Sequence, residues 1–434
     1  MALSRAGDDF CFVHAADLHL DTPFKGISET APHVGAALRE ASLEAFDSLV
    51  DLCLSRGAAF LVLAGDLYDG PERGLRAQLR LLDGLRRLSD AGIATFIVHG
   101  NHDPVEEGWS AVQTWPNLVH VFGHEAVEAV PVERDGHVLA TIQGISYGRR
   151  EVTENLALRF VRRAGEGLQV AVLHCNVAGA PDGHAPYSPC TLEDLRGVGL
   201  DYWALGHVHS RSVLSGSPGG SQSWVVYPGN LQARSPKPSE LGEKGATVVE
   251  VRAGRVASLE AVPCDRVRFV PLDLDVSTLE AVIDVRSQLA EAAAEALERA
   301  GGRSLVIRAR LVGRSPAHEE LRRDGVLGDL LASLRDDAGT STPFVWWDRI
   351  EDVCLPSLDV EQLRHGDDFA AELMAVADEL SDRGIGEDEL AEILGKVPRE
   401  LARLAAGLLE EPEASAVLVE QSVLAALDRL EVSS

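Results

Sequence analysis

Five short blocks of residue types that bind metals occur in the first half of the chain. Each follows a run of apolar residues, and they are Asp17-Leu18-His19, Gly65-Asp66-Leu67-Tyr68-Asp69, Gly100-Asn101-His102-Asp103, His174 and Gly206-His207-Val208-His209. Hard oxygen ligands combined with imidazoles suit Mn²⁺, Fe or Zn²⁺. The pattern predicts a metal centre whose ligands come from five separate places in the sequence.

Each block has an ordinary structural explanation when it is taken alone. Asp66 could cap the next helix, Asn101 and its neighbours favour turns, and His174 could be a core histidine with satisfied hydrogen bonds. The carboxyl ends of parallel strands, however, are where α/β proteins place their sites. Because all five blocks follow apolar runs in order, we expect them to share one sheet edge and one site.

Residue chemistry suggests a role for several of these side chains. One carboxylate can bridge two cations, and Asp66 is the natural shared ligand. The amide oxygen of Asn101 can ligate a metal without adding negative charge. His102 is then free for proton transfer, a role that histidine suits because its ordinary pKa lies near ~6.5, and we expect Asp103 to orient its ring. His14 points to the opposite face of its strand from Asp17, so we expect it to be structural.

The elements that must position these blocks are short buried strands and amphipathic helices. The predicted strands are Phe10–Ala16, Ala59–Ala64, Ala94–Val98, Val138–Ile145, Gln169–Leu173, Tyr202–Leu205, Trp224–Tyr227 and Ala246–Val251. Helices are predicted over Pro32–Arg56 and Leu75–Ala91, and residues 215–223 (SGSPGGSQS) form a predicted loop. Strand–helix–strand units of this kind predict a layered α/β domain with parallel pairing in its first half.

The character of the sequence changes near Pro263. The segment that follows predicts strands at Val267–Leu274, Ser304–Val312 and Phe344–Val353, with helices at Leu279–Arg299 and Ala317–Leu334. We expect this β-α-β-α-β stretch to lack a metal-type cluster. After Pro356 the pattern is helical, with breaks at Gly384, Gly386, Pro398 and Pro412. The predicted domains are therefore residues 1–262, 263–355 and 356–434.

Charge and composition exclude some classes of function. The 434 residues carry a formal charge of −28, which argues against a protein that coats nucleic acid through a general basic field. Nucleic acid remains open as a substrate, because bound metals supply local positive charge. No apolar run is long enough for a membrane span and no export signal is apparent. Six scattered cysteines suit a reducing compartment, so we expect a cytoplasmic protein.

The order of the blocks resembles the calcineurin-like metallophosphoesterase superfamily. Flanking segments extend the resemblance to bacterial DNA-repair exonucleases of the SbcD and YhaO type; they are FVHAADLHLDTPFKG, LAGDLYD, HGNHD, ALGHVHS and YPGNLQAR. The resemblance implies an α/β/β/α sandwich, a small α/β capping domain and a helical C-terminal region. It also implies a DNA substrate, docking of the C-terminal region on an SMC-like, SbcC-type ATPase, and homodimerisation through the first domain.

Carried onto this chain, the family pattern gives two groups of metal ligands. The first is Asp17, His19, Asp66 and His209; the second is Asp66, Asn101, His174 and His207. The resemblance implies two divalent cations, with Mn²⁺ expected first and Mg²⁺, Fe or Zn²⁺ as alternatives, and in-line attack of a bridging water on a phosphodiester. Archaeal and eukaryotic homologues have a histidine where this chain has Asp69, so the role of that histidine cannot be transferred.

Substrate contacts and partners depend on weaker signals. Loops near the expected site contain cationic residues that could contact phosphates, namely Lys25, Arg149, Arg150, Arg211 and Arg234. Two other functions remain open. One is a phosphoesterase acting on small molecules or phosphoproteins; the other is a subunit whose acidic tail chiefly anchors an ATPase partner. The tail from Pro356 onward contains 19 acidic and 6 basic residues.

Overall fold

The structure is a computed structural model that describes most of the chain. The described residues are 9–20, 22, 32–70, 73–165, 167–178, 187–220, 222–338, 342–358, 363–365, 369–383, 422–423 and 426–427. They form two compact units, which are described separately. Unit 1 comprises residues 1–271, 293–308 and 337–348, and unit 2 comprises residues 272–292, 309–336 and 349–434. The domain boundaries at 262 and 355 remain predictions.

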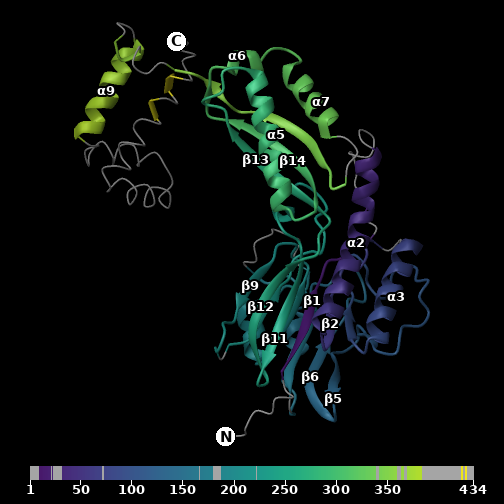
Figure 1. Ribbon diagram of the computed structural model, residues 1–434. Helices are drawn as coiled ribbons and strands as arrows, with labels where there is room; N and C mark the ends of the chain where they lie inside the picture. Colours follow the sequence, from purple (N-terminus) through teal and green to yellow (C-terminus); the bar gives the residue numbers. More distant parts are fainter. Residues whose placement is uncertain are drawn as a thin grey trace. The chain divides into compact units, whose positions relative to one another are not determined.

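Unit 1 contains two six-stranded sheets (Figure 1). The first sheet has the order β12 (Arg255–Pro263), β11 (Gly245–Arg252), β1 (Phe10–Ala15), β2 (Phe60–Ala64), β3 (Ala94–Val98) and β4 (Val119–Val121). The second has the order β5 (Glu128–Arg134), β6 (His137–Gly144), β7 (Leu168–His174), β8 (Tyr202–Gly206), β10 (Trp224–Tyr227) and β9 (Ser212–Ser215). Strands β1 to β4 pair in parallel, as do β6, β7, β8 and β10.

Aromatic and branched side chains pack between the two sheets. Phe12 stacks on Phe60 with ring centroids 4.7 Å apart and meets the edge of Tyr202 from the second sheet at 5.2 Å. His14 lies in the same layer, fully buried, with Nδ1 3.0 Å from the Tyr202 hydroxyl and Nε2 3.2 Å from the Leu205 carbonyl oxygen. Burial lowers the pKa of His14 to about 3, so it is a neutral structural residue, as predicted.

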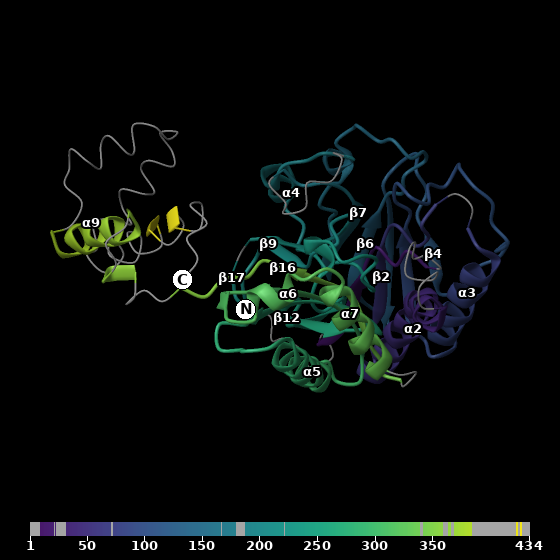
Figure 2. The same ribbon diagram turned by 90° about the horizontal axis from the view of Figure 1, so that it is seen from above.

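Helices cover the outer face of each sheet (Figure 2). Helices α2 (Pro32–Arg56) and α3 (Leu75–Asp90) pack their apolar faces on the first sheet, and α4 (Leu192–Val198) covers the second. Close approach of α2 and α3 requires Gly84, because a Cβ there would lie 2.4 Å from the Phe46 ring. The helices and sheets form the α/β/β/α sandwich that the sequence predicted.

The predicted elements of the first domain are confirmed to within about two residues at their ends. The sequence did not predict β4, β5, β9, β12 or α4. These are mostly short or half-exposed elements, in which the periodic apolar signal is weak. The predicted loop at 215–223 lies between β9 and β10, as expected, in its described residues.

The next sheet along the chain has three strands, in the order β13 (Val267–Asp275), β14 (Ser304–Val312) and β16 (Val345–Asp352). Helix α5 (Val282–Arg299) lies between β13 and β14 in the sequence. The helix predicted over Ala317–Leu334 is two helices, α6 (His318–Leu321) and α7 (Val326–Ala338). They separate at Gly325, which has a φ of +85° that favours glycine.

The rest of unit 2 includes a short parallel pair of β15 (Arg314–Ser315) and β17 (Leu355–Pro356), and then helix α9 (Phe369–Arg383). Helix α9 belongs to the predicted helical tail. Met374 and Ala377 of this helix pack with Val423 and Leu427. The predicted breaks at Gly384, Gly386, Pro398 and Pro412 lie outside the described residues.

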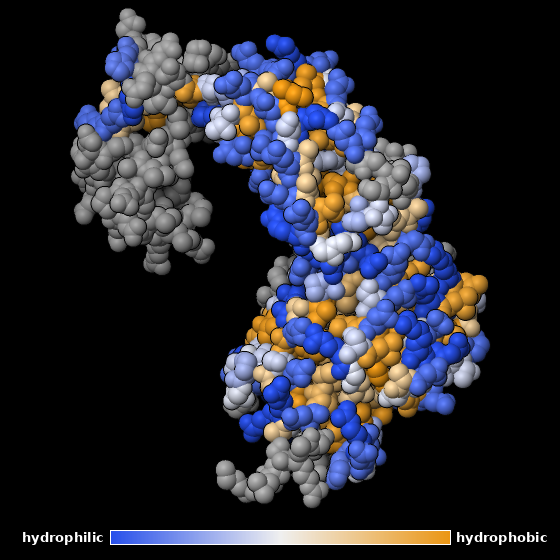
Figure 3. Space-filling model, viewed as in Figure 1, coloured by the Kyte–Doolittle hydropathy of each residue, from blue (hydrophilic) through white to orange (hydrophobic). Residues whose placement is uncertain are grey.

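The drawn face of each unit is mainly hydrophilic, with apolar residues in small groups between the polar ones (Figure 3). Exposed apolar side chains include Leu75 and Leu79 of α3 and Phe369 of α9. Of the helices that the structure describes, none combines the length and the apolar character needed to span a membrane.

Candidate metal centre

The five sequence blocks meet at one end of the sandwich in unit 1. The prediction that they share one sheet edge needs correction, since β1, β2 and β3 belong to the first sheet and β7 and β8 to the second. A cavity of about 460 Å³ opens there. It is lined by Thr22, Asp66, Asp69, His102, His207, His209, Arg234, Ser235, Lys237, Ser239 and Glu240. The site is therefore assembled from both layers.

The backbone turns sharply where the strands enter this site. Asp17, His19, Asp66 and His207 have φ values of +52°, +42°, +51° and +101°. Non-glycine residues rarely adopt this conformation, and each costs of order 1–3 kcal/mol. The backbone amides of Asp17 and His19 donate to the carbonyl oxygens of Gly65 and Asp66, both at 3.0 Å. The first two blocks are thereby held together in a conformation that the surrounding structure must enforce.

Asp17, His19 and His209 form the first group of donors. The Nε2 atoms of His19 and His209 are 3.2 Å apart. The Nδ1 atom of His209 lies 2.7 Å from Oε1 of Glu240, an acceptor, so Nδ1 carries the hydrogen and Nε2 keeps its lone pair. Two imidazole nitrogens on one tetrahedral zinc-like ion would lie about 3.3 Å apart. The observed spacing therefore fits a shared cation.

A second group surrounds His174, Asn101 and Asp66. The Nδ1–H of His174 donates to the Ala64 carbonyl oxygen at 2.9 Å, which turns Nε2 toward Oδ1 of Asn101 at 2.9 Å and Oδ2 of Asp66 at 3.4 Å. Oδ2 of Asp66 is also 3.8 Å from Nε2 of His19 in the first group. The ring of His207 lies 5.2 Å from that of His174, centroid to centroid. Asp66 thus lies between the two groups, and Asp17 of the first group also clusters with Asp66 and His174.

The electrostatics of these buried groups favour a cation. Burial raises the pKa of Asp17 to about 6. Burial alone would lower the pKa of His174, but Asp66 and Asp17 together raise it to about 9. The negative charge of these carboxylates thus stabilises a proton on His174. A metal cation at the same place would be stabilised by the same negative charge. Burial lowers the pKa of His19 to about 3, which leaves its ring neutral, as a metal ligand must be.

His102 lies at the rim of the cavity and is 29% exposed. Its Nδ1 atom is 3.4 Å from Oδ1 of Asp69, and its backbone amide donates to Oδ1 of Asp66 at 2.9 Å. The orienting role predicted for Asp103 is wrong. That carboxylate is fully buried and accepts from the amides of Gly100 and Leu67 and from Nδ1 of His99. Asp103 therefore shapes the loop, and Asp69 is the carboxylate beside His102.

The structure separates the five cationic residues predicted to contact phosphate. Arg234 lines the cavity, where its guanidinium pairs with Asp69. Arg149, Arg150 and Arg211 are exposed and are not among the described residues that line the cavity. Lys25 lies outside the described residues. Lys237, which the sequence reasoning did not select, also lines the cavity.

Three further buried residues support the site, and their roles were not predicted. Glu240 holds His209, and its second carboxylate oxygen accepts from Nδ2 of Asn230 at 2.7 Å and the amide of Arg234 at 3.1 Å. The ammonium of Lys244 donates to the carbonyl oxygen of His209 at 2.9 Å. Asn230 lies in the YPGNLQAR segment, and the family resemblance of that segment was the available signal. Spacing gave no signal for Glu240.

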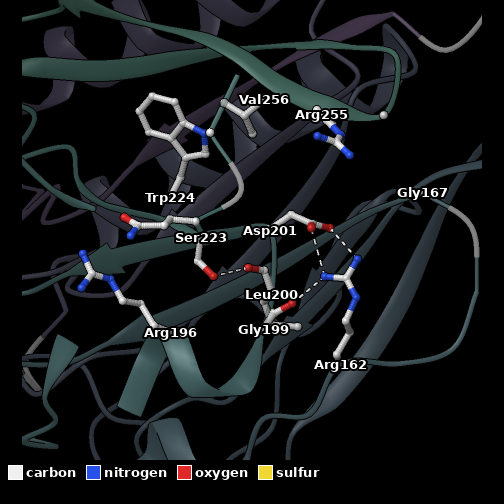
Figure 4. A pocket seen from close by; sticks show the side chains of 13 residues that line it. Arg162, Gly167, Arg196, Gly199, Leu200, Asp201, Ser223, Trp224, Arg255 and Val256 are labelled. Carbon is white, nitrogen blue, oxygen red and sulfur yellow. Dashed lines mark hydrogen bonds and ion pairs between the residues drawn. The ribbon is translucent and has the colours of Figure 1, made fainter. Parts of the chain in front are cut away.

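Another cavity, of about 530 Å³, lies at the opposite, N-terminal ends of β7, β8 and β10 (Figure 4). Arg162 forms an ion pair with Asp201 there, with Nη1 and Oδ1 3.0 Å apart, and Arg196 donates to Ser215. Arg255 also lines it. None of the predicted site residues is among the described residues lining this cavity, so the predicted site lies at the other end of the sandwich.

Comparison with known proteins agrees with the fold and the site, which together define a metallophosphoesterase. Residues 11–211 match the calcineurin-like phosphoesterase family, and residues 269–354 match the middle domain of the metallophosphoesterase YhaO. The chain is 35% identical to the metallophosphoesterase YhaO of Bacillus subtilis over 344 residues, which cover 79% of this chain and 82% of that protein. The chain belongs to the YhaO-type metallophosphoesterases of the calcineurin-like family.

More distant relatives are DNA double-strand break repair proteins named Mre11. The Aeropyrum pernix protein is 25% identical over 279 residues, covering 61% of this chain and 63% of that protein. The Haloferax volcanii protein is 28% identical over 261 residues, covering 58% and 54%. Family membership makes this chain a hydrolase of phosphoesters that uses divalent metals.

Proposed function

We propose that this protein is a two-metal phosphodiesterase that cleaves DNA as a repair-type exonuclease or endonuclease. The observation that carries the proposal is the convergence of two donor groups on Oδ2 of Asp66, 3.8 Å from His19 Nε2 and 3.4 Å from His174 Nε2. Similarity to the Mre11 repair proteins supports DNA as the substrate. Reduced, buried cysteines suit action in the cytoplasm.

We assign the seven predicted ligands to two positions. Asp17, His19, Asp66 and His209 would hold one cation, and Asp66, Asn101, His174 and His207 the other. Bound divalent cations supply Lewis acidity and lower the pKa of a bound water. The mixture of oxygen and imidazole donors suits Mn²⁺ as the working metal, with Mg²⁺, Fe and Zn²⁺ as the alternatives to compare.

The remaining side chains of the cavity would bind the substrate and move a proton. His102 is exposed enough to reach the leaving oxygen, to which it would donate a proton, and Asp69 lies 3.4 Å from its Nδ1 to stabilise the charged ring. Arg234 and Lys237 line the same cavity and would contact the phosphodiester. Burial of His19 and His174 keeps these two rings fixed while the substrate binds.

Substitutions separate metal binding from proton transfer. We expect Asn101→Ala and His207→Ala to lose metal and activity together. His102→Ala should retain metal and lose about 10²–10⁴-fold in turnover. His124→Ala is the matched control, because that histidine is 30% exposed and pairs with Glu106 away from the cavity. Wild-type turnover by His102→Ala would refute the proton-transfer role.

The class of substrate is tested with purified protein in Mn²⁺ or Mg²⁺. Linear duplex, single-stranded and circular DNA are compared with bis-p-nitrophenyl phosphate. We expect cleavage of DNA as well as of the small diester, and the contrast between linear and circular DNA distinguishes exonuclease from endonuclease action. Cleavage of the small ester alone would favour a small-molecule or phosphoprotein phosphoesterase instead.

We also propose that the acidic C-terminal region docks on an SMC-like ATPase. The described part of this region supports a docking role, because Phe369 and Val376 of α9 are 62% and 52% exposed. Co-purification from the native host should recover the ATPase with the full chain and lose it with a chain ending at Pro356. Retention of the ATPase by the truncated chain would exclude docking through the tail. Sedimentation of the same two chains tests whether the protein forms the expected homodimer through its first domain, which both chains contain.

A further inference from the structure

Unit 2 contains a cluster of metal-ligand types, in a segment where the sequence predicted none. His318 is the first residue of α6, while Asp352 ends β16 and Cys354 follows it by two residues. One ligand atom from each of the three lies within 4.8 Å of the others. We propose that His318, Asp352 and Cys354 bind a zinc ion.

The spacing of the two strongest ligands supports a tetrahedral ion. Sγ of Cys354 lies 3.5 Å from Nδ1 of His318. A zinc ion bound about 2.3 Å from sulfur and about 2.0–2.1 Å from nitrogen in tetrahedral geometry places these two atoms about 3.6 Å apart. The apo spacing is therefore already that of two ligands on one ion. The thiol of Cys354 would lose its proton when the metal enters.

The third ligand is placed by the local backbone. The amide of Cys354 donates to Oδ1 of Asp352 at 3.0 Å, which fixes the carboxylate beside the thiol in an Asp-Val-Cys sequence. Cys354 is 5% exposed, whereas Asp352 and His318 are half-buried. The sulfur is thus screened from bulk solvent while the carboxylate and imidazole remain reachable. An ion can enter without unfolding the segment.

A cavity of about 450 Å³ opens beside the three residues. Its lining also includes Asp324, Arg322, Gly325 and Gly328 from the α6–α7 connection and the start of α7. A zinc ion with three protein ligands keeps a fourth position for water or another ligand. The cavity supplies room for that ligand, and Asp324 is among its lining residues. Each of these residues belongs to unit 2.

The donor set favours zinc over Mn²⁺ and Mg²⁺, two of the metals considered for the phosphoesterase centre. A thiolate prefers softer ions such as Zn²⁺ to Mg²⁺ or Mn²⁺. The ligands proposed for the phosphoesterase centre are oxygen and nitrogen donors. A thiolate–metal signal therefore reports on Cys354 and is independent of the proposed nuclease activity.

Cobalt substitution provides the test, because Co²⁺ replaces zinc and thiolate ligands give a near-ultraviolet charge-transfer band. Full-length protein is treated with a chelator, titrated with Co²⁺ and then with Zn²⁺. We expect a thiolate–cobalt band that zinc abolishes. The band should be absent in Cys354→Ala and require at least about tenfold more cobalt in His318→Gln. Cys11→Ala, which removes another buried thiol, is the matched control and should retain the band.

Three results would overturn the zinc site, and two of them concern the thiolate band: its absence from wild-type protein, or its persistence unchanged in Cys354→Ala. His318→Gln guards against misfolding, because the ring is half-buried and glutamine preserves a polar side chain; an unchanged cobalt affinity in this variant also refutes the site. Hydrolysis of bis-p-nitrophenyl phosphate should be the same in Cys354→Ala and wild type. If neither wild type nor Cys354→Ala hydrolyses the diester, that result would count against the proposed function. It would not affect the conclusion about the zinc site, which depends on the cobalt titration.

Discussion

Replacing Glu240 by glutamine tests how the protein fixes the ring of His209. Glu240 is 4% exposed and receives three hydrogen bonds, from Nδ1 of His209, Nδ2 of Asn230 and the amide of Arg234. A carboxylate has two acceptor oxygens for these donors, whereas glutamine has one oxygen and one donating amide. Whichever way the amide is oriented, it points a donor at a donor.

The substitution acts on metal binding through the tautomer of His209. If the new amide faces Nδ1, that nitrogen must become the acceptor, and the hydrogen moves to Nε2, the atom 3.2 Å from Nε2 of His19. A protonated Nε2 cannot bind metal. Loss of a group that orients a ligand typically lowers metal affinity about 10–100-fold, which corresponds to about 1.4–2.8 kcal/mol. We expect Glu240→Gln to lower the metal affinity by a factor in this range.

Activity is measured against Mn²⁺ concentration with bis-p-nitrophenyl phosphate as substrate. The concentration for half-maximal activity should rise about 10–100-fold in Glu240→Gln, and saturating metal should restore most of the turnover. Glu243→Gln is the matched control, because Glu243 is 65% exposed and pairs with Arg268. An unchanged metal dependence in Glu240→Gln would show that the hydrogen bond to His209 does not set its tautomer.

Three other substitutions follow from the same geometry. Gly206→Ala places a Cβ 1.8 Å from the Ala64 carbonyl oxygen. We expect this variant to lose about 1–3 kcal/mol of unfolding free energy in urea and to bind metal more weakly. Wild-type stability and wild-type metal affinity would contradict the close approach. Asp265→Ala removes the buried carboxylate that pairs with Arg268 and Arg303, and it should cost about 3–5 kcal/mol of unfolding free energy. A loss below about 1 kcal/mol would mean that these two ion pairs contribute little to stability. Arg234→Ala should raise KM for the diester about tenfold or more, and Arg211→Ala, outside the cavity lining, should not; equal effects would remove Arg234 from substrate binding.

Much of the sandwich could be predicted because its strands are buried on both faces. Strands such as β2 and β8 are continuous apolar runs, and the polar block after each marks the strand end. The assignment of strands to two sheets could not be read from those runs. Strand order depends on crossovers and on pairing between distant segments, and neither leaves a local pattern.

The site could be predicted less completely than the strands. The blocks identified the residues that converge, but not which carboxylate contacts which histidine. Asp103 follows His102 directly, and adjacency suggested a pair, yet the turn points Asp103 inward to His99 and brings Asp69 to His102 from 33 residues away. Similarly, Glu240 meets His209 through tertiary packing. The cluster at Cys354 was missed because its histidine is 36 residues distant.

The division of the proposed ligands between two sheets would tie metal affinity to the completeness of folding. His174 and His209 lie in the second sheet or its loops, and Asp17 and Asp66 follow strands of the first, so neither layer alone has a full set of donors. A chain whose layers have not yet packed should bind metal weakly. By linkage, metal at one hundred times its Kd would stabilise the packed state by about 2.7 kcal/mol. In a cell, metal supply would then influence how much of the protein survives proteolysis as well as how fast it works.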